Sequence, residues 1–195
     1  METERGVSCY ITAGGKASRM SGAIKAFIEI DGQRIIDKNL KVINSIFSEV
    51  GIITNNKEKF AAYAKSGLRL VSDEYKDIGP LAGIHAAMAS SNSYFVFILA
   101  SDMPNISKSL MLKLISIANK TNADAVIPTY DGKIEPLFAV FKKSTINTLQ
   151  GFIESGESYA VRGFLKIINV EFYDVSKNDE RFFRNINYQK DIILK

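Results

Sequence analysis

Residues 7–20 read Val7-Ser8-Cys9-Tyr10-Ile11-Thr12-Ala13-Gly14-Gly15-Lys16-Ala17-Ser18-Arg19-Met20, a short apolar run followed by two glycines and then by cations. The apolar part is typical of a buried β-strand. Glycines let the backbone turn sharply and approach a ligand without a Cβ in the way, so that consecutive N–H groups can point at anionic oxygens. Arg19 and the nearby lysines, including Lys25, can then neutralise the charge of such a ligand. The stretch therefore predicts a strand that ends in a phosphate-binding loop.

Strand-like and helix-like segments alternate along the rest of the chain. The run at residues 94–100 is apolar throughout, as expected of a central parallel strand that is covered on both faces. Ser107 is a suitable N-cap, and Asp131-Gly132 suits a hairpin turn. The alternation favours an α/β sandwich with a mostly parallel sheet. Further strands are expected at residues 50–54, 68–71, 124–130, 135–141 and 170–175, and helices at 35–47, 57–66, 80–90, 107–120, 144–153, 161–167 and from Tyr188 onward.

Composition permits this fold and excludes several classes of protein. The 195 residues are 46% hydrophobic and 24% charged, which suits one globular domain over residues 1–195. A net charge of +4 suits a small polyanionic ligand, but the lysines are scattered and form no basic stripe for nucleic acid. Cys9 is the only cysteine, so an intrachain disulfide or a cysteine cluster is excluded. With no signal-like start and no apolar run of about 18 residues, we expect a soluble cytoplasmic protein without a membrane partner.

Polar residues stand where three of the expected strands end. In a parallel sheet, ligands bind at the carboxyl ends of the strands, beside the point where the strand order reverses. The first strand ends at Ala13-Gly14-Gly15, another at Asp73, and the apolar central strand at Asp102. An acid in that place is costly unless it is solvated, hydrogen-bonded or bound to a cation. Asp102 is therefore the best metal-ligand candidate, although an Asp before Pro104 also suits an ordinary turn.

The glycine loop fits neither of the two commonest nucleotide motifs. Gly14-Gly15-Lys16 lacks the four-residue spacer of a P-loop and the third glycine of a dinucleotide fingerprint. A glycine pair by itself is also typical of a plain turn. The loop gains meaning only together with the acids and cations around it.

Residues 13–20 with Lys25 resemble the signature loop of the nucleotidyltransferases, and specifically of the MobA family, the molybdenum cofactor guanylyltransferases. Four further segments resemble motifs of that family, in the same order. The resemblance covers about residues 7–191 and implies a single Rossmann-like three-layer sandwich of the nucleotide-diphospho-sugar transferase type. The four segments are Asp73 with Gly79-Pro80-Leu81-Ala82-Gly83-Ile84, then Asp102-Met103-Pro104, then Glu135-Pro136-Leu137-Phe138-Ala139, and finally Asn185-Ile186-Asn187.

The resemblance implies transfer of GMP from GTP to the terminal phosphate of molybdopterin, with release of pyrophosphate and with Mg²⁺ as cofactor. Arg19, Lys25 and Asp102 would be the catalytic residues, and Asp102 would also hold the metal. Asn185 and Asn187 would lie near the second substrate, and acceptor molybdoenzymes or their chaperones would be partners. The nucleotide would contact Thr12, Ala13, Gly14, Gly15, Lys25, Thr54, Asp73, Gly79, Pro80, Leu81 and Asp102, with the amides of residues 13–15 on the triphosphate and Asp73 on the guanine.

Two positions depart from the family pattern. Thr12 stands where leucine is usual, and Ile24 stands where an aspartate is common. Neither removes a charge that would contact phosphate. His85, the only histidine, is expected to be structural because no partner in the sequence suggests a triad or a metal site. The same glycine loop would also serve an enzyme that uses CTP or a sugar phosphate, and a non-catalytic carrier of molybdopterin or nucleotide is the alternative from another class.

Overall fold

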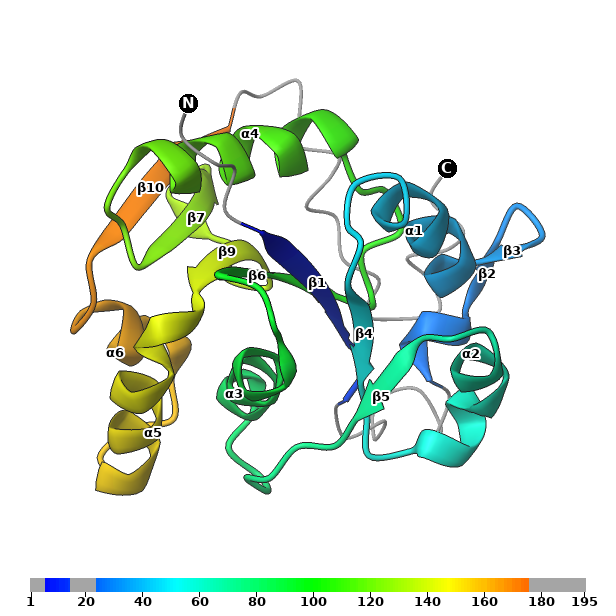
Figure 1. The fold of residues 1–195 in the computed structure, drawn as a ribbon, viewed down its shortest axis with the longest axis horizontal. Helices are drawn as coiled ribbons and strands as arrows, with labels where there is room; N and C mark the ends of the chain where they lie inside the picture. The colour runs from blue at the N-terminus through cyan, green and yellow to red at the C-terminus, as the bar shows by residue number, and fades with distance from the viewer. Residues whose placement is uncertain (1–5, 15–23, 176–195) are drawn as a thin grey trace.

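The computed structural model describes residues 6–14 and 24–175, and a mixed eight-stranded β-sheet forms its centre (Figure 1). Across the sheet the strands follow the order β10, β7, β9, β6, β1, β4, β5, with β8 paired to β7. β2 (Glu29–Ile30) and β3 (Gln33–Arg34) form a separate small hairpin. The strands of the main sheet are β1 (Val7–Thr12), β4 (Val50–Ile53), β5 (Arg69–Val71), β6 (Phe95–Ala100), β7 (Ala125–Tyr130), β8 (Lys133–Ile134), β9 (Phe138–Lys142) and β10 (Val170–Asp174).

Within the main sheet, four of the seven strand pairs are parallel, so the sheet is mostly parallel, as predicted. β1 pairs in parallel with β4 and with β6, β4 with β5, and β7 with β10. β9 is the exception among the longer strands, because it runs antiparallel to both β6 and β7. The carboxyl ends of β1, β4, β5 and β6 therefore meet at one edge of the sheet.

Helices cover both faces of the sheet and make a three-layer sandwich (Figure 1). Alternate residues of β6 point to opposite faces of the sheet and therefore pack in two separate cores. Phe97 and Leu99 pack in the core with α1 and α4, whereas Val96 and Ile98 pack in the core with α3, α5 and α6. All six residues of β6 are buried, which explains its unbroken apolar sequence. The helices are α1 (Ile35–Ile43), α2 (Ala61–Lys65), α3 (Pro80–Ser90), α4 (Lys108–Lys120), α5 (Ile146–Ser155) and α6 (Val161–Leu165), with short 3-10 turns η2 (Lys25–Phe27), η3 (Lys57–Phe60) and η4 (Lys143–Thr145).

Two predicted helices are shorter or less regular than their apolar spacing indicates. The helix expected over residues 35–47 ends at Ile43, although Phe47 still packs in the same core. After Ile43 the backbone tightens, because the N–H of Ser45 donates to Val42 O and that of Ile46 to Ile43 O. The helix expected over residues 57–66 likewise begins as the turn η3 before α2. Apolar periodicity persists through such tight turns and does not mark where an α-helix stops.

The strand expected over residues 135–141 is corrected by the structure. β9 begins only at Phe138, and the N–H of Phe138 donates to Glu135 O in a turn. Pro136 has no N–H to give to a strand ladder, which favours the turn. The Asp131-Gly132 hairpin exists, with φ of 48° and 69°, but it joins β7 to β8, since Tyr130 pairs with Lys133.

The predicted helix start at Ser107 is confirmed, because its side chain accepts a hydrogen bond of 3.2 Å from the N–H of Leu110. The helical stretch expected from Tyr188 lies outside the described residues. Within the described ranges, no helix combines the length and the apolar character that a membrane span requires.

Candidate active site

Residues from four different strand ends gather at the carboxyl edge of the parallel part of the sheet. The register sets Thr12 at the end of β1 beside Ile53 of β4 and beside Ala100 of β6. The residues that follow these ends, among them Gly14, Asn55, Asp73 and Asp102, therefore share one edge. This is the place where open α/β sheets bind their ligands.

A cavity of about 650 Å³ opens at this edge. A space of this size accommodates a ligand as large as a nucleotide. Among the residues expected to bind nucleotide, Thr12, Gly14, Asp73, Gly79 and Pro80 line it. The other lining residues are Ile53, Asn55, Asn56, Tyr75, Lys76, Asp77, Ala82, Gly83 and Leu137.

Asp73 presents a partly buried carboxylate to this cavity. The Asn55 Nδ2 donates to Asp73 Oδ2 at 3.4 Å, and the backbone N–H of Asp73 donates to Asn55 Oδ1 at 3.1 Å. The second carboxylate oxygen, Oδ1, is buried and has no hydrogen-bond partner within the described part of the chain. Burial raises the pKa of Asp73, while the hydrogen bond from Asn55 lowers it. A buried acceptor of this kind suits a ligand that brings its own N–H donors.

Asn55 is a cavity residue that the sequence analysis did not identify. The prediction named its neighbour Thr54, which is fully buried. The Thr54 hydroxyl accepts from the N–H of Asn56 at 3.1 Å and so shapes the turn instead of lining the cavity. The sequence did hold a signal for Asn55. This residue follows the end of β4 in the same way that Asp73 follows the end of β5.

The start of α3 forms one wall of the cavity. Gly79 has φ of 67°, a left-handed conformation that favours glycine. Pro80 then occupies the first helical position, where its missing N–H costs nothing. Gly83 lets the helix pack closely on β1, since a Cβ there would lie 3.1 Å from Thr12 Cγ2. Leu81, also expected at the nucleotide, is fully buried in the core instead.

The expectation that the amide of Ala13 holds phosphate needs correction. The Ala13 N–H donates to Ile53 O at 2.8 Å and thus continues the sheet. This N–H is committed to the backbone ladder, so Gly14 is the first residue of the loop whose amide could reach a phosphate. Gly15, Arg19, Asn185 and Asn187 lie outside the described residues, and their predicted roles stay predictions.

Lys25 and Asp102 are brought together from segments 77 residues apart. The Lys25 Nζ donates to Asp102 Oδ2 at 2.8 Å. The side chains are only 32% and 18% exposed, so the pair is shielded more than a surface salt bridge. A cation and an acid at a phosphate site can respectively bind phosphate oxygens and hold a metal ion.

The donor chemistry around Asp102 fits a hard divalent cation. No group of three or more His, Cys, Asp and Glu side chains that could hold a metal occurs in residues 6–14 and 24–175. Mg²⁺ characteristically takes one or two protein carboxylates and completes its shell with phosphate oxygens and water. Asp102 is not a lining residue of the cavity, but it follows the end of β6 next to β1, whose residues Thr12 and Gly14 line it. A carboxylate in that place is consistent with this mode of binding.

Glu135 is a second acid near Asp102 that the prediction did not assign to the site. β6 and β9 run antiparallel with Leu99 opposite Phe138, and the N–H of Ala100 donates to Leu137 O at 2.7 Å. This bond sets the turn before β9 against the end of β6, close enough for the charge of Asp102 to act on Glu135. Burial raises the pKa of Glu135 to about 7, a hydrogen bond from the Leu137 backbone lowers it, and the Asp102 charge raises it.

His85 lies behind the cavity wall. It is 4% exposed, and its ring meets the edge of Tyr75 with centroids 4.9 Å apart. Burial lowers its pKa, against weaker opposing effects of Glu74 and Glu154. These contacts agree with a packing role.

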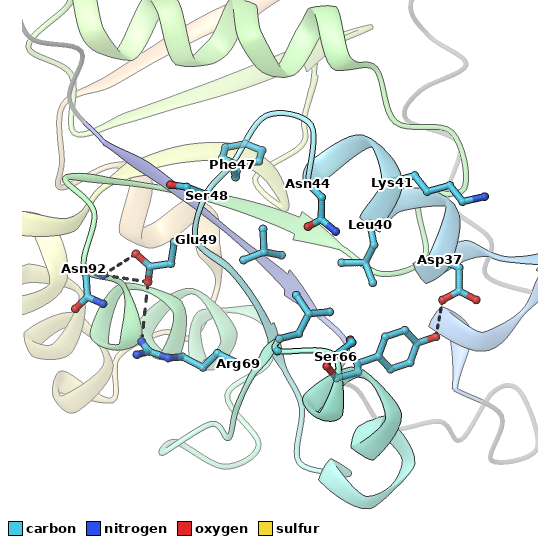
Figure 2. Close-up of a pocket in the computed structure, with 14 residues that line it drawn as sticks. Asp37, Leu40, Lys41, Asn44, Phe47, Ser48, Glu49, Ser66, Arg69 and Asn92 are labelled. Carbon is cyan, nitrogen blue, oxygen red and sulfur yellow. Dashed lines mark hydrogen bonds and ion pairs between the residues drawn. The ribbon is translucent and has the colours of Figure 1, made fainter.

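A second hollow, of about 660 Å³, lies between α1 and α2 at the amino ends of β4 and β5 (Figure 2). Its walls include Asp37, which accepts a 2.8 Å hydrogen bond from the Tyr63 hydroxyl. Its far end carries Glu49, Arg69 and Asn92. Among the described residues predicted for the site, not one lines this hollow.

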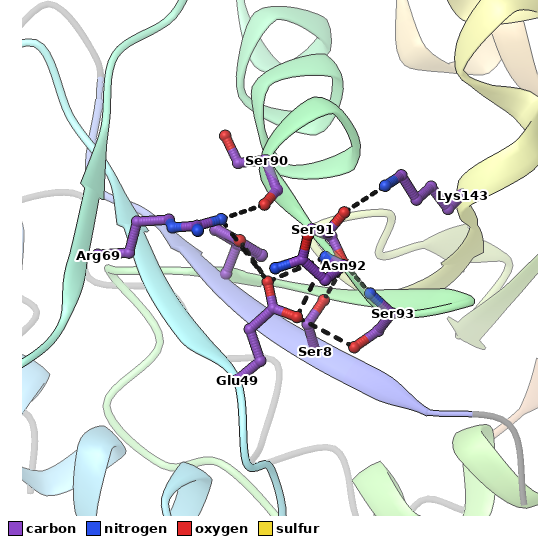
Figure 3. Close-up of polar contacts among 9 residues, drawn as sticks. Ser8, Glu49, Arg69, Ser90, Ser91, Asn92, Ser93 and Lys143 are labelled. Atoms are coloured by element: carbon purple, nitrogen blue, oxygen red, sulfur yellow. Dashed lines mark hydrogen bonds and ion pairs between the residues drawn. The ribbon is translucent and has the colours of Figure 1, made fainter.

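Glu49 is the centre of a polar network at the amino ends of the strands (Figure 3). Its carboxylate accepts from the N–H of Asn92 at 3.1 Å, from the Ser93 hydroxyl at 3.2 Å and from the Tyr10 hydroxyl at 2.9 Å. Arg69 approaches Glu49 to 3.9 Å and also donates to Ser90 O. Because these bonds satisfy backbone groups between α3 and β6, the network holds strand ends together on the side away from the cavity.

Comparisons with known proteins identify the family of this chain. A family model described as "MobA-like NTP transferase domain" matches residues 9–170. A probable molybdenum cofactor guanylyltransferase of Peptoclostridium acidaminophilum is 36% identical over 181 residues, which cover 90% of this chain and 79% of that protein. One of Natranaerobius thermophilus, with the same description, is 36% identical over 146 residues, or 74% of this chain and 70% of that protein. Among solved structures, molybdopterin-guanine dinucleotide biosynthesis protein A of Archaeoglobus fulgidus has a TM-score of 0.80 at 24% identity, covers 95% of both chains and shares the fold.

Proposed function

The chain belongs to the MobA-like NTP transferase domain family, and on that premise we propose that it transfers GMP from GTP to the terminal phosphate of molybdopterin. The observation that carries the proposal is the 36% identity to a probable molybdenum cofactor guanylyltransferase over 90% of the chain. We propose further that the chain acts as one nucleotidyltransferase domain. Its GTP would come from the cytoplasm, where we place the reaction.

The nucleotide base would lie against Asp73. Guanine carries adjacent N1–H and N2–H donors, and a carboxylate can accept both. Asp73 has one buried oxygen without a hydrogen-bond partner in the described ranges, while Asn55 holds the other oxygen. Cytosine lacks the N1–H donor of guanine, so this arrangement favours GTP over CTP.

The triphosphate would extend from Gly14 toward Lys25 and Asp102. An oxygen of the acceptor phosphate attacks the α-phosphorus of GTP, and the bond from that phosphorus to the bridging oxygen breaks. Pyrophosphate leaves with the electron pair. Because the attacking group is already a phosphate oxygen, the protein supplies position and charge stabilisation instead of a nucleophile.

Lys25 would neutralise charge that develops on the α-phosphate and the leaving pyrophosphate, and Arg19 would assist it. Asp102 would hold Mg²⁺, which when bound neutralises phosphate oxygens. The 2.8 Å contact with Lys25 fixes the direction of the Asp102 carboxylate. Asn185 and Asn187 would contact the second substrate, and molybdoenzymes or their chaperones would receive the product.

Turnover with molybdopterin and each of GTP, CTP, UTP and ATP tests the assignment. We expect GTP to be preferred. An equal or better rate with another nucleotide would overturn it in favour of a related transferase that uses CTP or a sugar phosphate. Binding of GTP by a folded protein without release of pyrophosphate would instead favour a carrier.

A further inference from the structure

We infer that Asn39 is a positioning residue, which holds the turn after β6 so that the Asp102 carboxylate meets Lys25. Asn39 lies in the middle of α1, far in sequence from the turn. Its Nδ2 donates a hydrogen bond of 2.9 Å to the carbonyl oxygen of Met103. Met103 directly follows Asp102, so this bond fixes the carbonyl group of the residue next to the acid.

The side chain of Asn39 is unusual for its surroundings. It is fully buried, among apolar neighbours on α1 that include Ile36, Leu40 and Ile43. Its Oδ1 is buried and has no hydrogen-bond partner among the described residues. An amide that is only half satisfied in a core is costly to keep. The bond to Met103 is the one benefit that the described contacts assign to it.

The backbone of the turn is restricted from its other side as well. Pro104 follows Met103, and a residue before a proline is biased away from the helical region toward extended conformations. Pro104 thus narrows the conformations of Met103, and Asn39 selects the direction of its carbonyl. Two independent restraints on one peptide indicate a turn whose orientation matters.

Lys38 forms a second clamp between the same helix and the same turn. Its Nζ donates to Asn105 Oδ1 at 3.0 Å. Adjacent residues of α1 therefore hold positions 103 and 105, immediately after Asp102. With the turn held in this way, Asp102 Oδ2 lies 2.8 Å from Lys25 Nζ.

The effect on catalysis rests on the proposed function. An acid that holds a metal against the triphosphate must be placed accurately, because a displacement of about 1 Å at a reacting centre can cost about 100-fold in rate. Releasing the turn would therefore reduce kcat more than it changes KM for GTP, since the base is held at Asp73.

The experiment compares wild type with Asn39→Leu, which keeps the size of the side chain but removes the donor. A crystal structure of Asn39→Leu should show the Met103 carbonyl turned and the Lys25–Asp102 distance increased beyond about 4 Å, the limit for an ion pair. At a temperature where both proteins are fully folded, kcat should fall about 10- to 100-fold, with KM for GTP within about threefold of the wild-type value.

A matched control is Asn119→Leu on α4. This variant loses the hydrogen bond from Asn119 Nδ2 to Ile115 O but lies away from the cavity, so its kcat should stay unchanged.

An unmoved Lys25–Asp102 pair in Asn39→Leu overturns the inference, and so does an unchanged kcat, whatever happens to the melting temperature. If Asn39→Leu does not fold, Lys38→Met removes the other clamp from the helix surface, and the same two readouts apply with a smaller loss of kcat. If wild type shows no turnover with GTP, the proposed function fails. The crystallographic distance then still decides whether Asn39 holds the pair.

Discussion

Replacing Glu135 by glutamine should make the protein more stable at alkaline pH and leave it nearly unchanged at acid pH. Burial raises the pKa of this carboxyl from its ordinary 4.5 to about 7 in the folded protein. Between these two pH values the unfolded chain has released the proton while the folded chain still holds it. The folded state then binds more protons, so stability falls as the pH rises through this window.

The size of the effect follows from the two pKa values. Each unit of difference corresponds to about 1.4 kcal/mol. A rise from 4.5 to about 7 therefore costs the folded wild type roughly 3 kcal/mol above pH 7. A glutamine side chain has the same shape and carries no charge, so the Glu135→Gln variant avoids this cost. Its advantage over wild type should grow from near zero below about pH 4.5 to roughly 3 kcal/mol at about pH 8.

Urea unfolding of both proteins from about pH 4 to about pH 9, with EDTA present to remove divalent cations, measures the difference. Glu171→Gln, which replaces an exposed carboxylate on β10, is the control and should show no growing advantage. A stability difference between wild type and Glu135→Gln that stays constant across this pH range would refute the reasoning.

Four further substitutions test other parts of the molecule. Lys25→Ala and Asp102→Ala should each reduce kcat at least about 100-fold, because charge stabilisation of the reacting phosphates is lost; steady-state pyrophosphate release measures this, and activity within about tenfold of wild type would contradict it. His85→Ala should keep most of its turnover in the same assay, since its contacts are packing contacts, and a loss as large as that of Asp102→Ala would contradict this. Gly51→Ala should lower stability by roughly 1–3 kcal/mol, because a Cβ there would collide with the ring of Tyr10; urea unfolding within about 0.5 kcal/mol of wild type would contradict the close packing.

Local sequence predicted the central strands and the start of α4 well. The apolar runs of β1 and β6 and the N-cap at Ser107 are each determined by neighbouring residues, so the pattern alone locates them. It failed at residues 135–137, where the apolar residues after Glu135 suggested one strand. There the missing N–H of Pro136 and the pairing of β8 with β7 produce a turn instead.

The site was predictable where a residue follows directly from a strand end, as Asp73 and Asp102 do. Asn55 was missed although it follows the end of β4 as Asp73 follows the end of β5. Glu135 was missed because its placement near Asp102 depends on how the turn before β9 packs against the end of β6. The commitment of the Ala13 amide to Ile53 O likewise depends on the pairing of β1 with β4. Such long-range pairings leave no mark in the local sequence.

The most direct test of the central claim uses GTP labelled with ³²P at either the α- or the γ-phosphate, together with Mg²⁺ and molybdopterin. Transfer of GMP predicts that the α-label appears in a pterin dinucleotide and that the γ-label leaves as pyrophosphate. Label from the γ-phosphate on the pterin, or no α-label on it with a folded protein, would contradict the account.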